Sequence, residues 1–203
     1  MASVDVVVWD FGGVLFDWDP AHLYRKVFET EEELDHFLTV VCPREWHFQH
    51  DAGVRFADTL PVRRTEFPDH AAAIDVYCER YVEMIAGPIP GMHELVEELR
   101  SSGVRQYGLS NMPEEPWPAI VEAWPMLAEL DGVVISGVEK LTKPDPAIFR
   151  LLTDRFAVDP AHAVFVDDVA RNVDGAIACG FAGIVFADAP QVRAEMRALG
   201  LPV

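Results

Sequence analysis

Residues 3–16, SVDVVVWDFGGVLF, constrain the fold of this chain more than any other stretch. Residues 4–9 form a short apolar run, broken only by Asp5 and rich in β-branched side chains, and the turn-forming pair Gly12-Gly13 follows it. Such a run predicts a strand that is buried on both faces within a parallel sheet. Asp10 would then stand at the carboxyl end of this strand, which is the edge where open α/β sheets bind their ligands.

A carboxylate at that position is costly to bury unless a cation or backbone N–H groups compensate its charge. Asp before Gly is also common in plain turns, so Asp10 alone does not decide between a site and a turn. Three later stretches also place polar residues after a predicted strand or in the loop that follows it. They are Leu109-Ser110-Asn111, Lys143-Pro144-Asp145-Pro146 and Phe165-Val166-Asp167-Asp168.

The order of the predicted elements indicates a sheet core with one helical insertion. After Phe16 the strand pattern stops, and residues 17–87 show only helical periodicity, starting at Asp19-Pro20. The Gly- and Pro-rich stretch 87–91 marks the return to the core. Strands and helices then alternate, which predicts a doubly wound α/β parallel sheet made of residues 1–16 and 88–203. We expect strands over 104–109, 132–136, 163–166 and 183–186, helices over 92–100, 145–156, 172–179 and 192–199, and loop with broken helix over 112–125.

Charge and composition exclude several classes of partner. The chain has 16 Lys and Arg against 34 Asp and Glu, a net charge of −18, so it repels nucleic acid and anionic membranes. No apolar run is long enough to span a bilayer, and the start of the chain lacks the pattern of a signal peptide. Three dispersed cysteines fit reduced thiols. We therefore expect a cytoplasmic monomer or weak homo-oligomer that acts on a small molecule.

The four polar stretches, in this order and at these separations, resemble those of the haloacid dehalogenase-like (HAD) hydrolase superfamily. The resemblance covers nearly the whole chain. It implies a Rossmann-like core with a small α-helical cap inserted after the first strand, here over residues 17–87. It also implies that Asp10 is a nucleophile, which would attack phosphorus to give an aspartyl phosphate that water then cleaves.

The acidic residues predict a metal site. If the predicted strands lie side by side, Asp10, Asp167 and Asp168 converge at one edge, and three such anions cannot all stay ionised without a cation. Mg²⁺ suits such a site, because it binds one or two carboxylates and leaves room for a substrate phosphate. The resemblance assigns the ligands to Asp10, the carbonyl of Gly12 and Asp168, with Asp167 acting through water. The alternative is that the acidic pair is only a solvated loop.

Other polar groups near Asp10 are predicted to bind the phosphate. Lys143 would screen the repulsion between the attacking carboxylate and the phosphate and would stabilise the transition state. The turn after Asp10 can form an anion-binding concavity from backbone N–H groups. Asn172 would orient the acidic loop. The predicted phosphate-binding residues are Gly12, Gly13, Ser110, Asn111 and Lys143.

Position 12 departs from the pattern of the superfamily. In most of its phosphatases this position holds a second Asp, which protonates the leaving group, and such proton transfer is worth about 10²–10⁴-fold in rate. One alternative is a leaving group that needs little protonation, such as an anomeric hydroxyl, an acyl phosphate or a phenol. A cap residue among Glu45, His47 and His50 could supply the proton. In a third alternative the enzyme attacks carbon, as haloacid dehalogenases do.

These alternatives leave two readings besides a Mg²⁺-dependent phosphatase. A metal-independent 2-haloacid dehalogenase would use Asp10 against carbon, and a catalytically silent protein would keep only the fold. The retained acidic pair favours the phosphatase. Sugar phosphates are one candidate substrate class, because the branch of the family with Gly at this position includes sugar-phosphate phosphatases. Arg25 and Arg44 are equally consistent with contacts to a substrate anion and with surface charges.

Overall fold

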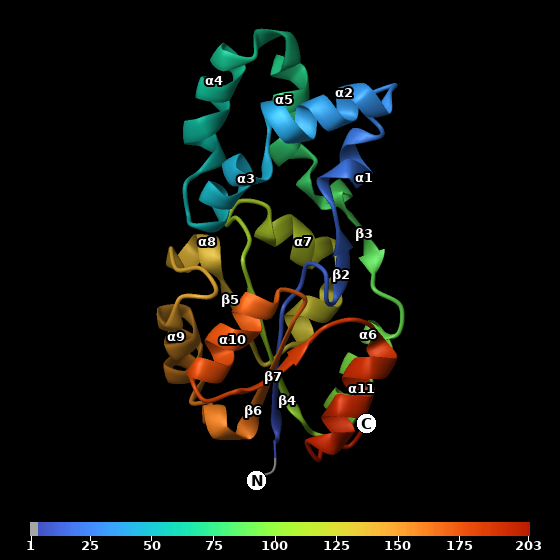
Figure 1. Cartoon of the computed structure of the whole chain (residues 1–203), viewed down its shortest axis with the longest axis vertical. Coiled ribbons are helices and arrows are strands. Elements are labelled where there is room, and N and C mark those ends of the chain that lie inside the picture. Colours follow the sequence, from blue (N-terminus) through green and yellow to red (C-terminus); the bar gives the residue numbers. More distant parts are fainter. Residues whose placement is uncertain (1–3) are drawn as a thin grey trace.

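The core of the computed structural model, which describes residues 4–203, is a sheet of five parallel strands (Figure 1). Residues 1–3 of the predicted core lie outside the described residues. The strand order is β5-β4-β1-β6-β7, and all four pairings are parallel. This confirms the predicted doubly wound α/β class. The strands are β1 (Val6–Trp9), β4 (Arg105–Ser110), β5 (Gly132–Ile135), β6 (Ala163–Asp167) and β7 (Ala182–Val185).

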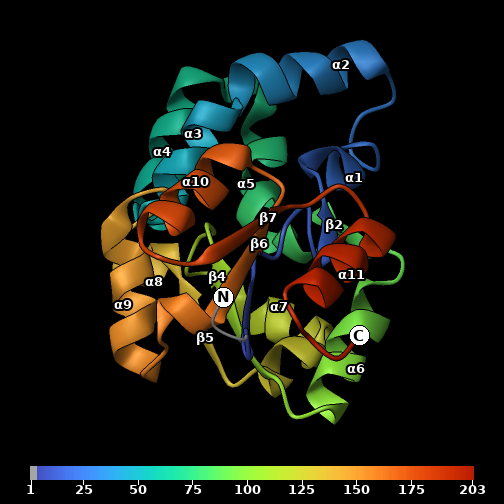
Figure 2. The same ribbon diagram turned by 60° about the horizontal axis from the view of Figure 1, so that its bottom comes forward.

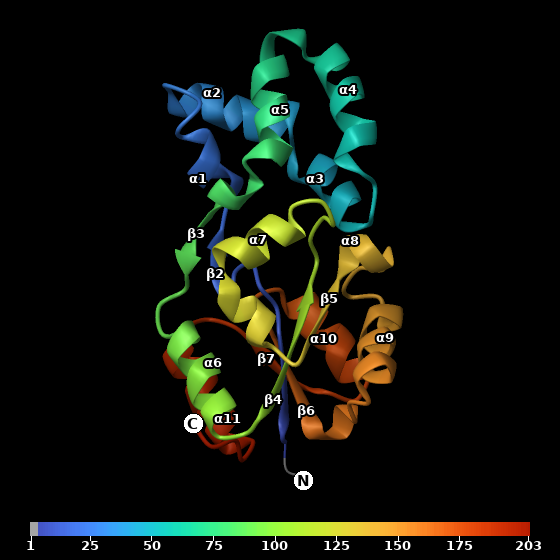
Figure 3. The same ribbon diagram turned by 180° about the vertical axis from the view of Figure 1, so that it is seen from behind.

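The central strand β1 is buried on both faces, as its apolar run predicts. Val7 and Trp9 belong to the hydrophobic cluster that includes α6 and α11, whereas Val6 and Val8 belong to the one that includes α9 and α10. Figures 2 and 3 show these two helix pairs on opposite sides of the sheet. The core helices are α6 (Met92–Ser101), α7 (Trp117–Ala123), α8 (Ser136–Glu139), α9 (Pro146–Phe156), α10 (Ala170–Ala178) and α11 (Ala189–Ala198), with the 3₁₀ turns η4 (Pro125–Glu129) and η5 (Pro160–His162).

All regular elements between residues 20 and 84 are helical, and we call this segment the cap. In Figure 1 the cap lies beyond the end of the sheet at which β1 and β4 finish. Asp19 caps the first helix by accepting a hydrogen bond from the Ala21 N–H at 2.8 Å, with Pro20 in the first helical position. The elements are α1 (Pro20–Tyr24), α2 (Glu31–His36), the π-helix η1 (Phe37–Val41), α3 (Arg44–Asp51), α4 (Phe56–Glu66), η2 (Pro68–His70), α5 (Ala71–Glu79) and η3 (Tyr81–Met84).

A two-stranded ribbon joins the cap to the core. Its strands are β2 (Phe16–Trp18) and β3 (Ile85–Pro88), which pair antiparallel. The expectation that residues 17–87 hold no strand is therefore wrong at both ends of the segment, over residues 17–18 and 85–87. A strand this short shows no alternating pattern of its own, and it exists because a partner from much later in the chain supplies its hydrogen bonds. The two chain segments that connect the core to the cap are therefore hydrogen-bonded to each other.

Two hydrogen bonds connect the cap to the core away from the ribbon. The Ser136 hydroxyl donates to the Asp51 carbonyl at 2.6 Å, and the Phe56 N–H donates to the Glu115 carboxylate at 2.8 Å. The second bond caps α4 from the core side, because Arg55 at its start offers no side-chain cap. Both bonds hold the cap against the core in this conformation.

Among the described residues, no helix has the length and hydrophobicity that crossing a bilayer requires.

Candidate active site

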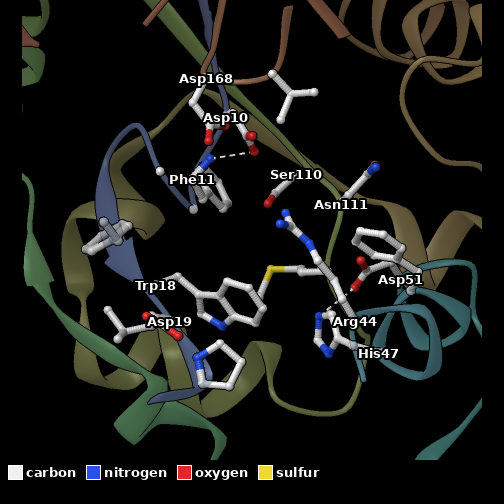
Figure 4. Close-up of a pocket in the computed structure, with 18 of the residues that line it drawn as sticks. Asp10, Phe11, Trp18, Asp19, Arg44, His47, Asp51, Ser110, Asn111 and Asp168 are labelled. Atoms are coloured by element: carbon white, nitrogen blue, oxygen red, sulfur yellow. Dashed lines mark hydrogen bonds and ion pairs between the residues drawn. The ribbon is translucent and has the colours of Figure 1, made fainter. Parts of the chain in front are cut away.

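A cavity of about 590 Å³ lies between the core and the cap. Its core side includes Asp10, Ser110 and Asp168, each at or just beyond the carboxyl end of a strand. Its cap side includes Arg44, His47 and Asp51 from α3 (Figure 4). Several aromatic side chains complete the wall, so a substrate would be enclosed by both parts of the chain. The aromatic lining residues are Phe11, Phe16, Trp18, Phe48, Tyr77 and Tyr81.

Three carboxylates meet at one end of this cavity. Each of Asp10, Asp167 and Asp168 offers an oxygen, and these oxygens all lie within 4.8 Å of one another. Asp10 is 7% exposed and Asp167 is fully buried, whereas Asp168 is exposed. Neighbouring parallel strands cause this meeting, because β1 pairs with β6 along its whole length. The structure thus brings together the acidic residues that the sequence predicts to converge.

Lys143 lies between two of these carboxylates. Its Nζ is 2.8 Å from Asp10 Oδ1 and 2.7 Å from Asp167 Oδ2, and the residue is only 3% exposed. Asp167 also accepts hydrogen bonds from the Val169 N–H at 2.8 Å and from the Asn172 amide at 3.1 Å. Protein donors therefore already engage both oxygens of Asp167. Asp168 is the member of the acidic pair that faces the cavity.

The pKa values show that one lysine does not balance this much negative charge. Burial raises the pKa of Asp10 to about 7 despite the opposing effect of Lys143, and the charge of Asp167 adds to the rise. Burial and then Asp167 likewise raise the pKa of Asp168. Burial alone would lower the pKa of Lys143, but Asp10 and Asp167 hold it above its ordinary value. A bound divalent cation would relieve this excess of negative charge.

The donor set fits a hard cation such as Mg²⁺. Asp10 and Asp168 present carboxylate oxygens at the cavity, and Gly12 lines the same cavity on the turn after β1. The Gly12 carbonyl accepts no hydrogen bond from any of residues 4–203, so it is free to bind a cation. Oxygen ligands of this kind, with open positions left for water and phosphate, are what Mg²⁺ prefers.

Gly13 has a different role from the predicted one. Its N–H donates to the Phe16 carbonyl at 2.9 Å, so it does not face a substrate oxygen in this conformation. Its φ is +79°, and a Cβ at this position would lie 2.5 Å from Asp168 Oδ2. Gly13 therefore allows the turn after β1 and the loop after β6 to approach each other, which places Asp168 beside Asp10.

We expect Gly13→Ala to disturb the candidate metal site. The added methyl group would push the Asp168 carboxylate away, and the left-handed backbone would cost about 1–2 kcal/mol of stability. If Asp168 binds Mg²⁺, displacing its carboxylate should weaken Mg²⁺ binding about 10–100-fold. Isothermal titration with Mg²⁺ measures the effect, and Gly103→Ala is a matched control, because Gly103 also has a positive φ but stands in open space away from the cavity. Unchanged Mg²⁺ affinity would contradict this role of Gly13.

Ser110 and Asn111 follow β4, as predicted, but their side chains do different things. Ser110 is buried and lines the cavity, where Figure 4 shows its hydroxyl pointing inward. The Asn111 amide group donates to the Lys143 carbonyl at 3.1 Å and accepts from the Lys143 N–H at 2.9 Å. The Asn111 side chain thus positions the Lys143 loop, and only its backbone N–H is left for a substrate oxygen.

The three cap residues predicted as proton donors are placed very differently. Glu45 is exposed and does not line the cavity. His50 is buried away from it, with its ring nitrogens 3.1 Å from the His47 carbonyl and 2.8 Å from Thr59 Oγ1. His47 does line the cavity, but Nδ1 lies 3.0 Å from the Tyr77 hydroxyl and Nε2 lies 3.3 Å from Asp51 Oδ1. Nδ1 of His47 is therefore hydrogen-bonded, whereas Nε2 only lies near a carboxylate oxygen that has no hydrogen-bond partner among the described residues.

The sequence interpretation missed several polar and aromatic residues of the wall, among them Asp51 and Trp18. A signal for Asp51 exists in the spacing, because Arg44, His47 and Asp51 stand at i, i+3 and i+7 and so share one face of α3. A helix face that carries charges at these positions and turns inward is unusual for a structural helix. Trp18 lies on β2, which the sequence does not indicate, and its ring packs 5.0 Å from that of His47.

Comparison with known proteins points to one family. The profile of the haloacid dehalogenase-like hydrolases matches residues 4–180. A sesquiterpene phosphatase of Aspergillus oryzae is 24% identical over 192 residues, which cover 95% of this chain and 94% of that protein. A phosphorylated carbohydrates phosphatase of Thermotoga maritima is 24% identical over 184 residues, which cover 87% and 82% of the two chains.

Solved structures share the fold. A HAD family enzyme of Bacteroides thetaiotaomicron, solved as a magnesium complex, superposes with a TM-score of 0.72 at 18% identity, covering 97% of this chain and 99% of that one. An L-2-haloacid dehalogenase of Xanthobacter autotrophicus superposes with a TM-score of 0.62 at 20% identity, covering 96% and 83% of the two chains. At such low identity these matches concern the fold, and the chemistry has to be argued from the site.

Proposed function

This chain belongs to the haloacid dehalogenase-like hydrolases, and we propose that it is a Mg²⁺-dependent phosphatase that hydrolyses a small phosphate ester through a phosphorylated Asp10. The observation that carries the proposal is the meeting of Asp10, Asp167 and Asp168 within 4.8 Å. Among residues 4–203, Lys143 is the only cation in ion-pair contact with them. As part of the same proposal, the enzyme works in the cytoplasm as a monomer or weak homo-oligomer.

In the proposed reaction, a carboxylate oxygen of Asp10 attacks phosphorus and the leaving-group oxygen departs with the electron pair of its bond. Water then attacks the aspartyl phosphate, which releases phosphate and restores the carboxylate. Lys143 and the Phe11 N–H both bind Asp10 Oδ1, at 2.8 Å and 2.7 Å, and so fix the orientation of the carboxylate (Figure 4). The Ser110 hydroxyl is placed to donate to the phosphoryl group.

Asp10, the Gly12 carbonyl and Asp168 would hold the Mg²⁺ ion. When bound, Mg²⁺ supplies positive charge that neutralises phosphate oxygens and keeps Asp10 ionised. Asp167 contributes by holding Lys143 and, through Asn172 and Val169, by fixing the loop that carries Asp168. In this proposal Asp167 acts by positioning Lys143 and the Asp168 loop, in place of the water-mediated contact with the metal that the sequence analysis expects.

A 2-haloacid dehalogenase is the second candidate, because Gly12 supplies no acid and a departing halide needs none. The acidic pair argues against it, since attack on carbon gives no reason to hold Asp168 beside Asp10 and Asp167. The names of two phosphatase relatives suggest substrates to try, a sesquiterpene phosphate and a phosphorylated carbohydrate. Of these we favour a sugar phosphate with the phosphate on the anomeric carbon, because that leaving group is comparatively acidic and tolerates Gly12.

The deciding experiment is phosphate release from sugar phosphates, an acyl phosphate, an isoprenyl monophosphate and an aryl phosphate. Each is assayed with Mg²⁺ and with chelator. We expect release that needs Mg²⁺ and is fastest for the substrates with acidic leaving groups. Equal release in the presence of chelator would overturn the metal requirement. Halide release from 2-haloacids without any phosphate release would establish the dehalogenase instead. No activity in either assay would favour a binding protein.

The effect of Mg²⁺ on stability should grow with pH. Without metal, burial holds the folded-state pKa of Asp10 at about 7, above its ordinary value of 3.8. Between about pH 4 and pH 7 the folded state therefore binds more protons at Asp10 than the unfolded state does, so this group's contribution to stability falls as pH rises through that window. Mg²⁺ competes with the same proton. We expect a larger Mg²⁺-induced rise in Tm at pH 8 than at pH 6, and a smaller pH dependence in Asp10→Asn. An equal rise at both pH values would contradict this titration of Asp10.

A further inference from the structure

We propose that Arg44 takes over part of the work of the missing acid by stabilising negative charge on the leaving-group oxygen. This inference rests on the proposed phosphatase activity and adds a residue from the cap to its machinery. It answers a problem that the site itself raises, since Gly12 has no side chain with which to donate a proton. The argument depends on which polar groups near Asp10 remain free to act.

The acidic side chains next in the chain after Gly12 are already engaged. Asp17 pairs with His22, with Oδ2 and Nε2 3.2 Å apart. Asp19 accepts the Ala21 N–H as the cap of α1. Both residues line the cavity, but Asp19 is held at the helix start, and the side chain of Asp17 is 58% exposed beside His22. Neither is a free replacement for an Asp at position 12.

On α3, the two acid–base side chains that line the cavity, His47 and Asp51, lie against each other and are each 4% exposed. The Tyr77 hydroxyl is 3.0 Å from His47 Nδ1, and His47 Nε2 is 3.3 Å from Asp51 Oδ1, which has no hydrogen-bond partner among the described residues. This buried pair forms a polar wall of the cavity. It positions the inner face of α3, whose first residue is Arg44.

Arg44 is placed differently from these residues. It lines the cavity, and Figure 4 shows its side chain running from α3 toward Ser110 and the side of the cavity that holds Asp10. It forms no ion pair with an acidic side chain of the described chain, and its guanidinium carbon lies 5.3 Å from the centre of the Phe48 ring, which supports the side chain. Its charge also reaches the metal-site end of the cavity, where it lowers the pKa of Asp168 against the raising effect of burial.

A guanidinium at this place can help a leaving group without donating a proton. Arginine stays protonated at working pH, so it cannot act as the general acid. Its N–H groups can instead bind the oxygen that gains charge as the bond to phosphorus breaks. As Asp10 forms its bond to phosphorus, the leaving oxygen keeps the electron pair of the broken bond. Arg44 holds the resulting anion until it takes a proton from water.

This role predicts a particular dependence on the leaving group. Substrates whose leaving groups are weak acids develop the most charge on the departing oxygen and should need Arg44 most. We expect Arg44→Met to lower kcat/KM about 10²–10³-fold for an alkyl phosphate, the usual effect of removing one donor to a developing oxyanion. For 4-nitrophenyl phosphate, whose leaving group needs little help, we expect a loss of less than about 10-fold.

The experiment measures kcat/KM with Mg²⁺ for an alkyl phosphate and a series of phenyl phosphates whose leaving-group pKa values span several units. Arg44→Met should make the rate fall more steeply with leaving-group pKa than in the wild type, and Arg44→Lys should restore part of the difference. Arg55→Met is the matched control, since Arg55 is an exposed cap arginine that does not line the cavity. Circular dichroism and Tm of each variant check that the fold is intact.

The outcomes separate this inference from the proposed function. An equal loss for every substrate would mean that Arg44 only binds the phosphate and would overturn the inference while leaving the phosphatase intact. Unchanged kinetics in Arg44→Met would overturn it as well. If the wild type released no phosphate from any substrate, the proposed function would fail, and the role of Arg44 with it. A steeper dependence in Arg44→Met, with Arg55→Met unchanged, supports the inference.

Discussion

Replacing Asp10 by Asn is expected to lower kcat for phosphate release by at least about 10⁴-fold, the usual cost of removing a covalent nucleophile. Asn keeps the shape of the side chain but has no carboxylate oxygen with which to attack phosphorus. It also removes one negative charge from the cluster, so Mg²⁺ should bind more weakly. Steady-state assays with the best substrate of the panel, at saturating Mg²⁺, measure the loss.

The fold should survive this change. Asp10 is buried, and burial raises its pKa to about 7. A neutral side chain therefore removes the free-energy cost of burying this charge in the metal-free protein. Lys143 keeps its contact with Asp167 at 2.7 Å. Asp154→Asn is a suitable control, since Asp154 is exposed and lies outside the active-site cavity. Turnover by Asp10→Asn within about 10-fold of the wild type would rule out Asp10 as the nucleophile.

Replacing Lys143 by Met should affect both stability and activity. The ammonium group bridges Asp10 and Asp167 from a position that is 3% exposed, and Met fills a similar volume without a charge. Breaking a buried ion pair by removing one partner costs about 3–5 kcal/mol, because the remaining charge is left uncompensated. We expect a loss of this size at pH 8 in the absence of metal, measured by urea unfolding. Activity should fall about 10²–10³-fold or more, because a charge that stabilises the transition state is lost.

Two comparisons make the Lys143 prediction specific. Lys26→Met removes an exposed lysine whose Nζ is 2.9 Å from Glu83, and a surface pair of this kind should cost less than about 1 kcal/mol. The destabilisation of Lys143→Met should shrink at acid pH, where the carboxylates take up protons, and saturating Mg²⁺ should reduce it as well. A destabilisation that is the same at pH 5 and pH 8 would show that packing, and not charge, accounts for the effect.

The sheet and the residues at its edge could be predicted because their signals are local. An apolar run such as β1 shows where a strand is buried, and the polar residue that follows it shows where the strand ends. Asp10, Ser110 and Asp167 could therefore be placed at one edge of the sheet before any contact was known. The meeting of the acidic residues follows from strand order, since parallel neighbours end at the same side.

Hydrogen bonds between distant segments decided what the sequence left open. Asn111 was grouped with the phosphate ligands, but its side chain bonds the Lys143 backbone, 32 residues away. The strand β2 exists only through its pairing with β3. Gly13 was assigned a phosphate contact from its place in the turn, and its actual importance comes from the closeness of Asp168.

By itself, the sequence determined the fold class, the helical insertion, the family and the acidic cluster around Asp10. These features could be predicted because the pattern of a strand and the position of its end depend on residues that are close together in the sequence. Only the tertiary structure decided which cap residues face that cluster. The same helix α3 carries His47, which lies against Tyr77 and Asp51, and Arg44, which lines the cavity without an ion-pair partner among the described residues. The different surroundings of these two residues depend on how the cap packs against the core, and the spacing of residues along one helix does not predict that packing.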